Sequence, residues 1–121
     1  KTIQVLTHLL AEKESGRQKG PNLIIAPTSL MANWENECNR FTPDLKVLIL
    51  QGAQRQSQFE NIHSADIVLS TYPLINRDKE IFLEHNFHYL ILDEAQYIKN
   101  PYTKAYQALL EVKANHTLCM T

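Results

Sequence analysis

The sequence is poor in cysteine, nearly neutral in charge and without a long apolar run. Its 121 residues contain two isolated cysteines, Cys38 and Cys119, which fit a reducing compartment better than a disulfide framework or a metal site. The formal net charge of −1 gives no bulk field for nucleic-acid binding, so any such binding has to be local or shared with another domain. No apolar run approaches membrane-spanning length and no secretory leader is recognisable, so we expect a soluble intracellular protein without membrane contact.

What the sequence does contain is an alternation of short apolar segments and helical patterns. Its length and its 44% hydrophobic content fit a single domain. Strands are predicted at residues 22–26, 46–50, 66–70, 88–92 and 117–120. Helices are predicted at the start of the chain, after Thr28 or Ser29 as a cap, at residues 54–62 and 73–85, and after Pro101. This order predicts an α/β fold with a mainly parallel sheet covered by helices on both faces, and both ends of the domain look cut.

The helical spacing also predicts which side chains face the core. Trp34 is interpreted as a core anchor on its helix rather than as a platform for base stacking. The other expected inner faces are Ile3, Leu6, Leu9 and Leu10 in the first helix, Leu30, Cys38 and Phe41 beside Trp34, Leu74, Ile75, Ile81 and Phe82 in the third, and Tyr102, Ala105, Tyr106, Leu109 and Leu110 in the last.

Two adjacent carboxylates, Asp93 and Glu94, follow the apolar run at residues 88–92. In open α/β sheets ligands bind outside the carboxyl ends of the strands, so a charged pair at such an end is a site candidate. Two neighbouring carboxylates suit a metal–phosphate reaction, in which one holds Mg²⁺ and the other positions the attacking water. The alternative is an acidic, solvated loop.

The chain opens with Lys1 and Thr2 directly before a helical pattern. A Lys–Ser/Thr pair at a helix N-terminus is the way a phosphate-binding loop ends, with the lysine on the terminal phosphates and the hydroxyl on Mg²⁺. The dipeptide carries little weight alone. Together with Asp93 and Glu94, it places both elements of a nucleotide–metal site on one predicted sheet.

An ordered set of motifs now carries a family resemblance. The segments are Lys1-Thr2-Ile3-Gln4, Ile25-Ala26-Pro27-Thr28-Ser29-Leu30 with Asn33-Trp34, Leu69-Ser70-Thr71-Tyr72, Leu92-Asp93-Glu94-Ala95-Gln96, Ile98-Lys99-Asn100-Pro101 and Leu118-Cys119-Met120-Thr121. In this order they resemble the first RecA-like lobe of SWI/SNF-type DNA-dependent ATPases of helicase superfamily two. The resemblance spans the whole chain, from the end of motif I to the start of motif III. It implies a three-layer RecA-like fold of the P-loop NTPase class, truncated at both ends.

The resemblance implies a role for each residue of the nucleotide site. Lys1 matches the lysine that contacts the β- and γ-phosphates of ATP, and Thr2 matches a ligand of Mg²⁺. Asp93 matches the acid that holds Mg²⁺, and Glu94 matches the residue that polarises the hydrolytic water. Gln96 stands where many relatives have histidine, and it is expected to link the nucleotide site to a second RecA-like lobe.

A second group of residues matches loops that lie against a nucleic-acid backbone in this family. These residues are Pro27, Thr28 and Ser29 in motif Ia, Ser70 and Thr71 in motif Ib, and Lys99 and Asn100 after the acidic strand end. Backbone N–H and hydroxyl groups suit phosphate oxygens and carry no sequence information. The alternatives are that Thr28 and Ser29 only cap a helix and that Lys99 is solvated.

The sequence is thus read as part of the first motor lobe of an ATP-dependent double-stranded DNA translocase that remodels or displaces DNA-bound protein. Because the phosphate-loop glycines and the second lobe are not in these 121 residues, we expect them alone to hydrolyse essentially no ATP. Two alternatives stay open, a superfamily-two RNA helicase and a catalytically silent scaffold. We expect a bacterial cytoplasm, in association with the nucleoid, or a nucleus if the source is eukaryotic.

Overall fold

The computed structural model describes residues 2–98 and 100–121, and its centre is a five-stranded parallel sheet. The strands are β1 (Asn22–Ala26), β2 (Val47–Ile49), β3 (Ile67–Thr71), β4 (Asn86–Leu92) and β5 (Lys113–Cys119), in the spatial order β2-β3-β1-β4-β5. Every neighbouring pair is parallel. This arrangement confirms the predicted α/β class, since parallel neighbours need crossover segments that place helices on the faces of a sheet.

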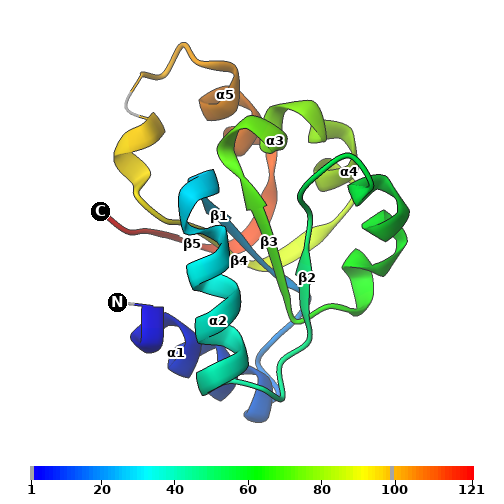
Figure 1. The fold of residues 1–121 in the computed structure, drawn as a ribbon, viewed down its shortest axis with the longest axis vertical. Coiled ribbons are helices and arrows are strands. Elements are labelled where there is room, and N and C mark those ends of the chain that lie inside the picture. Colours follow the sequence, from blue (N-terminus) through cyan, green and yellow to red (C-terminus); the bar gives the residue numbers. More distant parts are fainter. Residues whose placement is uncertain (1, 99) are drawn as a thin grey trace.

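Helices cover both faces of this sheet and give three layers (Figure 1). The helices α1 (Thr2–Glu14) and α2 (Met31–Phe41) share one apolar cluster with the sheet. The helices α3 (Tyr72–Arg77), α4 (Lys79–Leu83) and α5 (Lys104–Glu111) share a second cluster on the opposite face. Three 3₁₀ segments, η1 (Thr28–Leu30), η2 (Arg55–Ser64) and η3 (Ala95–Ile98), complete the described elements.

The strand register brings three chain segments to one edge of the sheet. Ala26 of β1 is paired with Thr71 of β3, and Ile25 of β1 is paired with Leu92 of β4. Because the strands are parallel, all three leave the sheet on the same side. Their next residues, Pro27, Tyr72 and Asp93, are therefore neighbours at the carboxyl edge, where ligands bind in folds of this class.

The helix predicted at residues 73–85 is wrong in one respect, because it is broken at Asp78. The Arg55 guanidinium donates from Nε and Nη2 to the Asp78 carboxylate at 2.7 and 3.0 Å. Asp78 separates α3 from α4 with φ −102° and ψ 21°, outside helical geometry. A partner from the 3₁₀ segment η2 thus fixes a bend that local helical spacing does not show. That segment, predicted as a helix at residues 54–62, forms 3₁₀ turns.

The prediction that Thr28 or Ser29 caps the following helix is also wrong. These residues form a 3₁₀ turn after Pro27, and neither that turn nor α2 has a side-chain cap. Four other expectations fail at helix ends. Ile3, Phe41 and Leu110 are 47%, 37% and 66% exposed, and Tyr102, 89% exposed, precedes α5, whose cap is Thr103.

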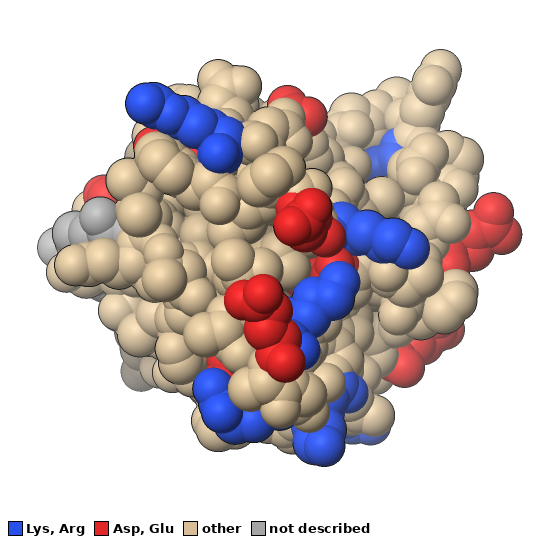
Figure 2. Space-filling view, turned by 90° about the horizontal axis from the view of Figure 1, so that it is seen from below, with Lys and Arg blue, Asp and Glu red and all other residues tan. Residues whose placement is uncertain are grey.

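The surface carries charges of both signs. On the face turned to the viewer in Figure 2, acidic and basic side chains lie interspersed rather than in patches of one sign. No helix among the described residues has the length and apolar character that crossing a membrane requires. The interspersed charges agree with a near-neutral chain whose binding groups have to be sought locally.

Candidate functional site

Asp93 is the first residue after β4, and two N–H groups fix its carboxylate. Its Oδ2 accepts a hydrogen bond from Trp34 Nε1 at 2.8 Å, and its Oδ1 accepts one from the backbone N–H of Glu94 at 3.0 Å. Its own N–H donates to the carbonyl of Ile25 at 2.8 Å, which continues the sheet ladder by one residue. The side chain is 9% exposed, so its orientation is set by the protein rather than by solvent.

Trp34 confirms the prediction of a core anchor and adds a contact that the sequence reading missed. It is 1% exposed and packs in the cluster between α2 and the sheet. A buried indole N–H needs an acceptor, and that requirement is the one signal in the sequence for such a contact. The acceptor lies 59 positions away along the chain, so only the fold identifies it as Asp93.

Glu94 has an unusual backbone conformation. Its φ of 51° lies in the left-handed region, where residues other than glycine are uncommon. Such strain concentrates at functional sites, where the surrounding structure maintains it. Here Ala95 N–H donates to the carbonyl of Met120 at 2.7 Å, which ties the turn to the end of β5. The Gln96 amide donates to Glu94 Oε1 at 2.7 Å, so Gln96 orients the carboxylate.

The two adjacent carboxylates have the charge that a cation requires. Within residues 2–98 and 100–121, no lysine or arginine forms an ion pair with Asp93 or Glu94. In the same part of the chain, no three His, Cys, Asp or Glu side chains are grouped to hold a metal by themselves. Mg²⁺ is usually held by one or two carboxylates together with substrate phosphates and water, and the donors present fit that arrangement.

Helix α1 begins at the same edge of the sheet. It runs antiparallel to β4, since Glu12 Oε1 lies 3.0 Å from His88 Nε2 and His8 Nε2 lies 2.9 Å from the Tyr89 hydroxyl. From His8 back to Thr2 the helix rises about 9 Å, and from Tyr89 to Asp93 a strand extends about 13 Å. Thr2 is therefore at the edge where β4 ends. Lys1 lies outside the described residues.

The residues predicted to contact nucleic acid are placed differently from one another. Thr28 and Ser29 are exposed, and no capping role occupies their side chains. Ser70 and Thr71 are buried at the end of β3, and the Ser70 hydroxyl donates to the carbonyl of Leu50 at 3.4 Å. Pro27 is buried. Asn100 is exposed, with its Oδ1 accepting from Tyr102 N–H at 2.9 Å, and Lys99 lies outside the described residues.

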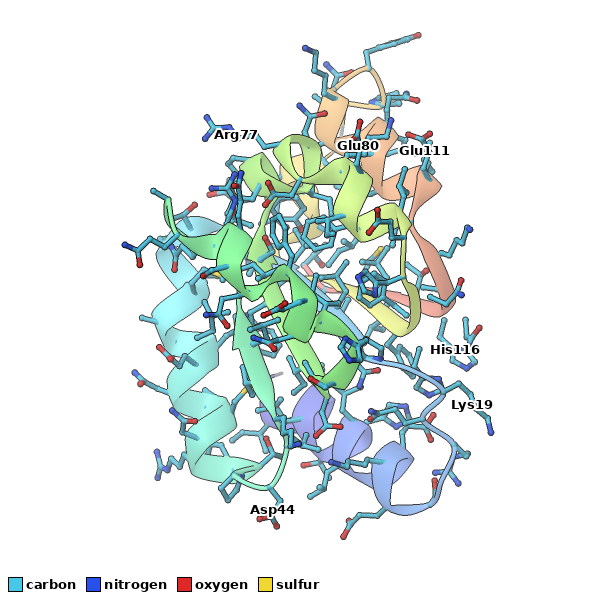
Figure 3. The ribbon with its side chains drawn as sticks, turned by 90° about the vertical axis from the view of Figure 1, so that its right-hand side faces the viewer. Lys19, Asp44, Arg77, Glu80, Glu111 and His116 are labelled. Atoms are coloured by element: carbon cyan, nitrogen blue, oxygen red, sulfur yellow. The ribbon has the colours of Figure 1, made fainter. Side chains whose placement is uncertain are left out.

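A cavity of about 630 Å³ lies between η1, α3, η3 and the start of α5, and we call it the loop cavity. Among the described residues, its lining carries two cations, Arg77 and Lys104, and no acidic residue. Arg77 projects outward from the end of α3 (Figure 3). Sequence reasoning missed both cations, because nothing local marks them. The described residues that line it are Pro27, Thr28, Ser29, Tyr72, Pro73, Asn76, Arg77, Tyr97, Lys104 and Ala105.

Tyr72 connects this cavity to the acidic turn. Its hydroxyl donates to the backbone carbonyl of Asp93 at 2.6 Å, and its ring stacks on Tyr97 at 5.9 Å between centroids and 6° between planes. Burial raises the pKa of the Tyr72 phenol, and the negative charge of Asp93 raises it further. The phenol therefore stays protonated and remains a hydrogen-bond donor.

Comparison with known proteins decides the family. The model of the family described as "SNF2-related domain" matches residues 1–121. The chain belongs to this family. A Bacillus subtilis protein named "Putative ATP-dependent helicase/translocase YwqA" is 42% identical over 127 residues, which cover 100% of this chain and 13% of that protein. Helicase swr1 of Schizosaccharomyces pombe is 38% identical over 125 residues, covering 99% of this chain and 10% of that protein.

The fold of this SNF2-related domain also matches a solved structure. The Sulfolobus solfataricus SWI2/SNF2 ATPase core in complex with dsDNA superposes with a TM-score of 0.91 at 33% identity, over 100% of this chain and 25% of that one. The match confirms the predicted RecA-like arrangement and the resemblance inferred from the motifs. The domain spans a small part of the length of each relative, so it corresponds to a piece of their motor region.

Proposed function

We propose that this SNF2-related domain is part of a motor that hydrolyses ATP and moves along double-stranded DNA. The observation that carries the proposal is the Asp93–Glu94 turn, two adjacent carboxylates fixed at the carboxyl edge of a parallel sheet without a lysine or arginine partner among the described residues. Membership of the family, together with the names of its relatives, supports ATP as the nucleotide.

Each residue of the nucleotide site has a defined task in this proposal. Asp93 and the hydroxyl of Thr2 hold Mg²⁺, Lys1 binds the terminal phosphates, and Glu94 orients the attacking water and accepts its proton. Gln96 binds at the nucleotide and keeps the Glu94 carboxylate in place through its amide. Mg²⁺ supplies neutralisation of phosphate charge, the main requirement of phosphoryl transfer. The protein supplies orientation, through the donors to Asp93 and the strained backbone of Glu94.

The DNA contacts are proposed for the loop cavity and its surroundings. Thr28 and Ser29 offer exposed hydroxyls, while Arg77 and Lys104 offer positive charge. Contacts to phosphates position a duplex without reading its sequence, as movement along DNA requires. Pro27, Ser70, Thr71, Lys99 and Asn100 remain proposed contacts. Ser70 and Thr71 are 0% and 2% exposed, backbone included, so a contact with either residue requires that neighbouring side chains move.

A second RecA-like lobe of the same protein is the proposed partner that closes over the nucleotide. We therefore also propose that residues 1–121 alone bind ATP weakly and hydrolyse essentially none. The proposed location is a bacterial cytoplasm with nucleoid association, or the nucleus if the source is eukaryotic. Saturable ATP binding in the micromolar range by the isolated domain, measured by calorimetry, would contradict the proposal that residues 1–121 alone bind ATP weakly.

The test of the function is steady-state ATP hydrolysis by the full-length protein with no nucleic acid, single-stranded DNA, duplex DNA or RNA. Duplex DNA is expected to stimulate most. Glu94→Gln is expected to lower the stimulated rate by about 10²–10⁴-fold, the usual contribution of general-base catalysis. Glu14→Gln, at an exposed position on α1, is the matched control and should leave the rate unchanged. Stimulation by RNA alone would favour an RNA helicase, and no hydrolysis at all would favour a silent scaffold.

A further inference from the structure

Two of the segments proposed to contact nucleic acid, Thr28-Ser29 and Ser70-Thr71, are each followed along the chain by an aromatic residue that hydrogen-bonds to Asp93. Trp34 lies on α2, which the loop of Thr28 and Ser29 leads into, and its Nε1 donates to Asp93 Oδ2 at 2.8 Å. Tyr72 directly follows Thr71, and its hydroxyl donates to the Asp93 carbonyl at 2.6 Å. Trp34 and Tyr72 are 1% and 6% exposed. The Thr28-Ser29 segment and the Ser70-Thr71 strand end are therefore both connected, through buried hydrogen-bond donors, to Asp93.

Tyr72 holds one peptide group directly, and Trp34 holds the same peptide group indirectly, through the Asp93 carboxylate. The peptide between Asp93 and Glu94 has its carbonyl bound by Tyr72. Its N–H donates to Asp93 Oδ1, and the other oxygen of that carboxylate is bound by Trp34. This peptide leads into the Glu94 backbone with its φ of 51°. Rotation of the peptide would thus break at least one of these hydrogen bonds and would also redirect the Glu94 side chain.

Tyr97 extends the connection to the surface. It is 63% exposed and lines the loop cavity, while its ring stacks on Tyr72. Its N–H donates to the Glu94 carbonyl at 3.0 Å, so Tyr97 is attached to the acidic turn at a second point. A nucleic-acid strand in the loop cavity would contact Tyr97 directly. Because the Tyr97 ring stacks on Tyr72, such a strand would also restrict the position of the Tyr72 ring.

We infer that Tyr72 and Trp34 are positioning residues that couple occupancy of the loop cavity to the geometry of the Asp93–Glu94 turn. DNA in the cavity fixes the Tyr72–Tyr97 stack and the loop before α2. The two donors then hold the turn in the conformation in which Asp93 faces the metal and Glu94 faces the water. The inference rests on the proposed function, and it identifies how nucleic acid regulates that same site.

The test is the equilibrium coupling between DNA and nucleotide in the full-length protein. The affinity for a fluorescein-labelled DNA duplex is measured by anisotropy without nucleotide and with Mg²⁺ and a non-hydrolysable ATP analogue. Coupled sites typically change each other's affinity by about 5–150-fold. Tyr72→Phe keeps the stacked ring and removes the hydroxyl. We expect it to reduce the coupling to less than about twofold and the stimulation of hydrolysis by DNA in the same proportion.

Two further variants make the result specific. Trp34→Phe removes the other donor and should reduce the coupling in the same direction. Tyr89→Phe is the matched control, because it also removes a tyrosine hydroxyl and its hydrogen bond, the one to His8 at 2.9 Å, on the strand that leads into Asp93. It should keep the coupling of the unmodified protein.

Three outcomes would overturn the inference. The first is Tyr72→Phe with full coupling. The second is equal loss of coupling in Tyr89→Phe. The third is a loss of coupling in Tyr72→Phe and Trp34→Phe that is fully explained by a lower melting temperature of these variants. Both residues would then have a structural role. Failure of the proposed function is distinguishable from all three, since the unmodified protein itself would then show no stimulation by duplex DNA.

Discussion

Two buried carboxylates, Glu12 beside the start of β4 and Asp93 directly after its end, have different hydrogen-bond partners. Glu12, 6% exposed, receives the Arg17 guanidinium on Oε2 and lies 3.0 Å from His88 Nε2 through Oε1. Among residues 2–98 and 100–121, the donors to the carboxylate of Asp93, which is 9% exposed, are two neutral N–H groups. A buried charge is costly unless it is paired, so Glu12 has a counter-ion, Arg17, built into the fold, whereas Asp93 has none among the described residues and is left for a cation from outside. The first pattern stabilises a structure and the second prepares a site.

The largest expected effect is on the ATPase rate, which should depend on Asp93 and not on Glu12. Asp93→Asn removes the charge and keeps an acceptor for Trp34, so the domain should fold normally. The DNA-stimulated ATPase rate of the full-length protein should fall on the order of 100-fold, as when one electrostatic group of a catalytic site is removed. Glu12→Gln should lower the melting temperature and leave the rate per folded molecule unchanged. The reverse pattern would contradict the comparison.

The next effect concerns the cations of the loop cavity. Arg77→Gln and Lys104→Gln should each weaken duplex binding for all sequences alike. Each should also lower the slope of log affinity against log salt by about 1, as expected for one lost phosphate contact. The matched control is Lys19→Gln, which Figure 3 shows far from Arg77 on the molecule. Anisotropy titrations over a range of salt concentrations provide the measurement, and an unchanged slope in both cavity variants would refute the contact.

A smaller expected effect is the pH dependence of the stabilisation that the Glu12 carboxylate provides. Hydrogen bonds from Arg17 and then from His88 lower the pKa of Glu12 from 4.5 to about 2. Because the folded-state pKa is depressed, the stabilisation is present above pH 4.5 and is lost as the pH falls from 4.5 towards 2. The difference in unfolding free energy between the unmodified protein and Glu12→Gln should shrink over this interval. A difference independent of pH would exclude this role of the ionised carboxylate.

The smallest effect tests whether α2 holds Trp34 against the sheet as described. Cys38 lies one helical turn after Trp34 and is buried, and burial raises the pKa of its thiol to about 11. Cys119 at the end of β5 is exposed. Iodoacetamide at neutral pH should therefore modify Cys119 and leave Cys38 unmodified until the protein unfolds. Mass spectrometry of the native protein gives the answer, and rapid labelling of Cys38 would show that α2 is loosely packed.

The sequence predicted the sheet and the acidic turn because both depend on local signals. Apolar runs alternating with helical spacing are enough for a parallel sheet, and Asp93 and Glu94 follow such a run directly. The order of the motifs gave the family, which the comparisons confirm. The break at Asp78 was missed since its cause, Arg55, is 23 positions away. Thr28 and Ser29 were misread as caps because capping residues and 3₁₀ turns after proline use the same residue types.

Most of the candidate site's environment could not be read from the sequence for the same reason. Trp34 and Tyr72 meet Asp93 across 59 and 21 positions, and only strand order brings them together. Arg77 and Lys104 are ordinary surface cations until α3 and α5 place them on one cavity. Residue types thus indicate which chemistry is present, while the donors that orient it come from the fold.

The central claim, that Asp93 awaits an external cation while Glu12 does not, is tested most directly by metal binding. Mn²⁺, a spectroscopic substitute for Mg²⁺, can be titrated by electron paramagnetic resonance into the full-length protein with a non-hydrolysable ATP analogue. We predict that the unmodified protein and Glu12→Gln bind Mn²⁺ with equal affinity and that Asp93→Asn binds it at least about 10-fold more weakly. Equal binding by all three proteins would contradict the account.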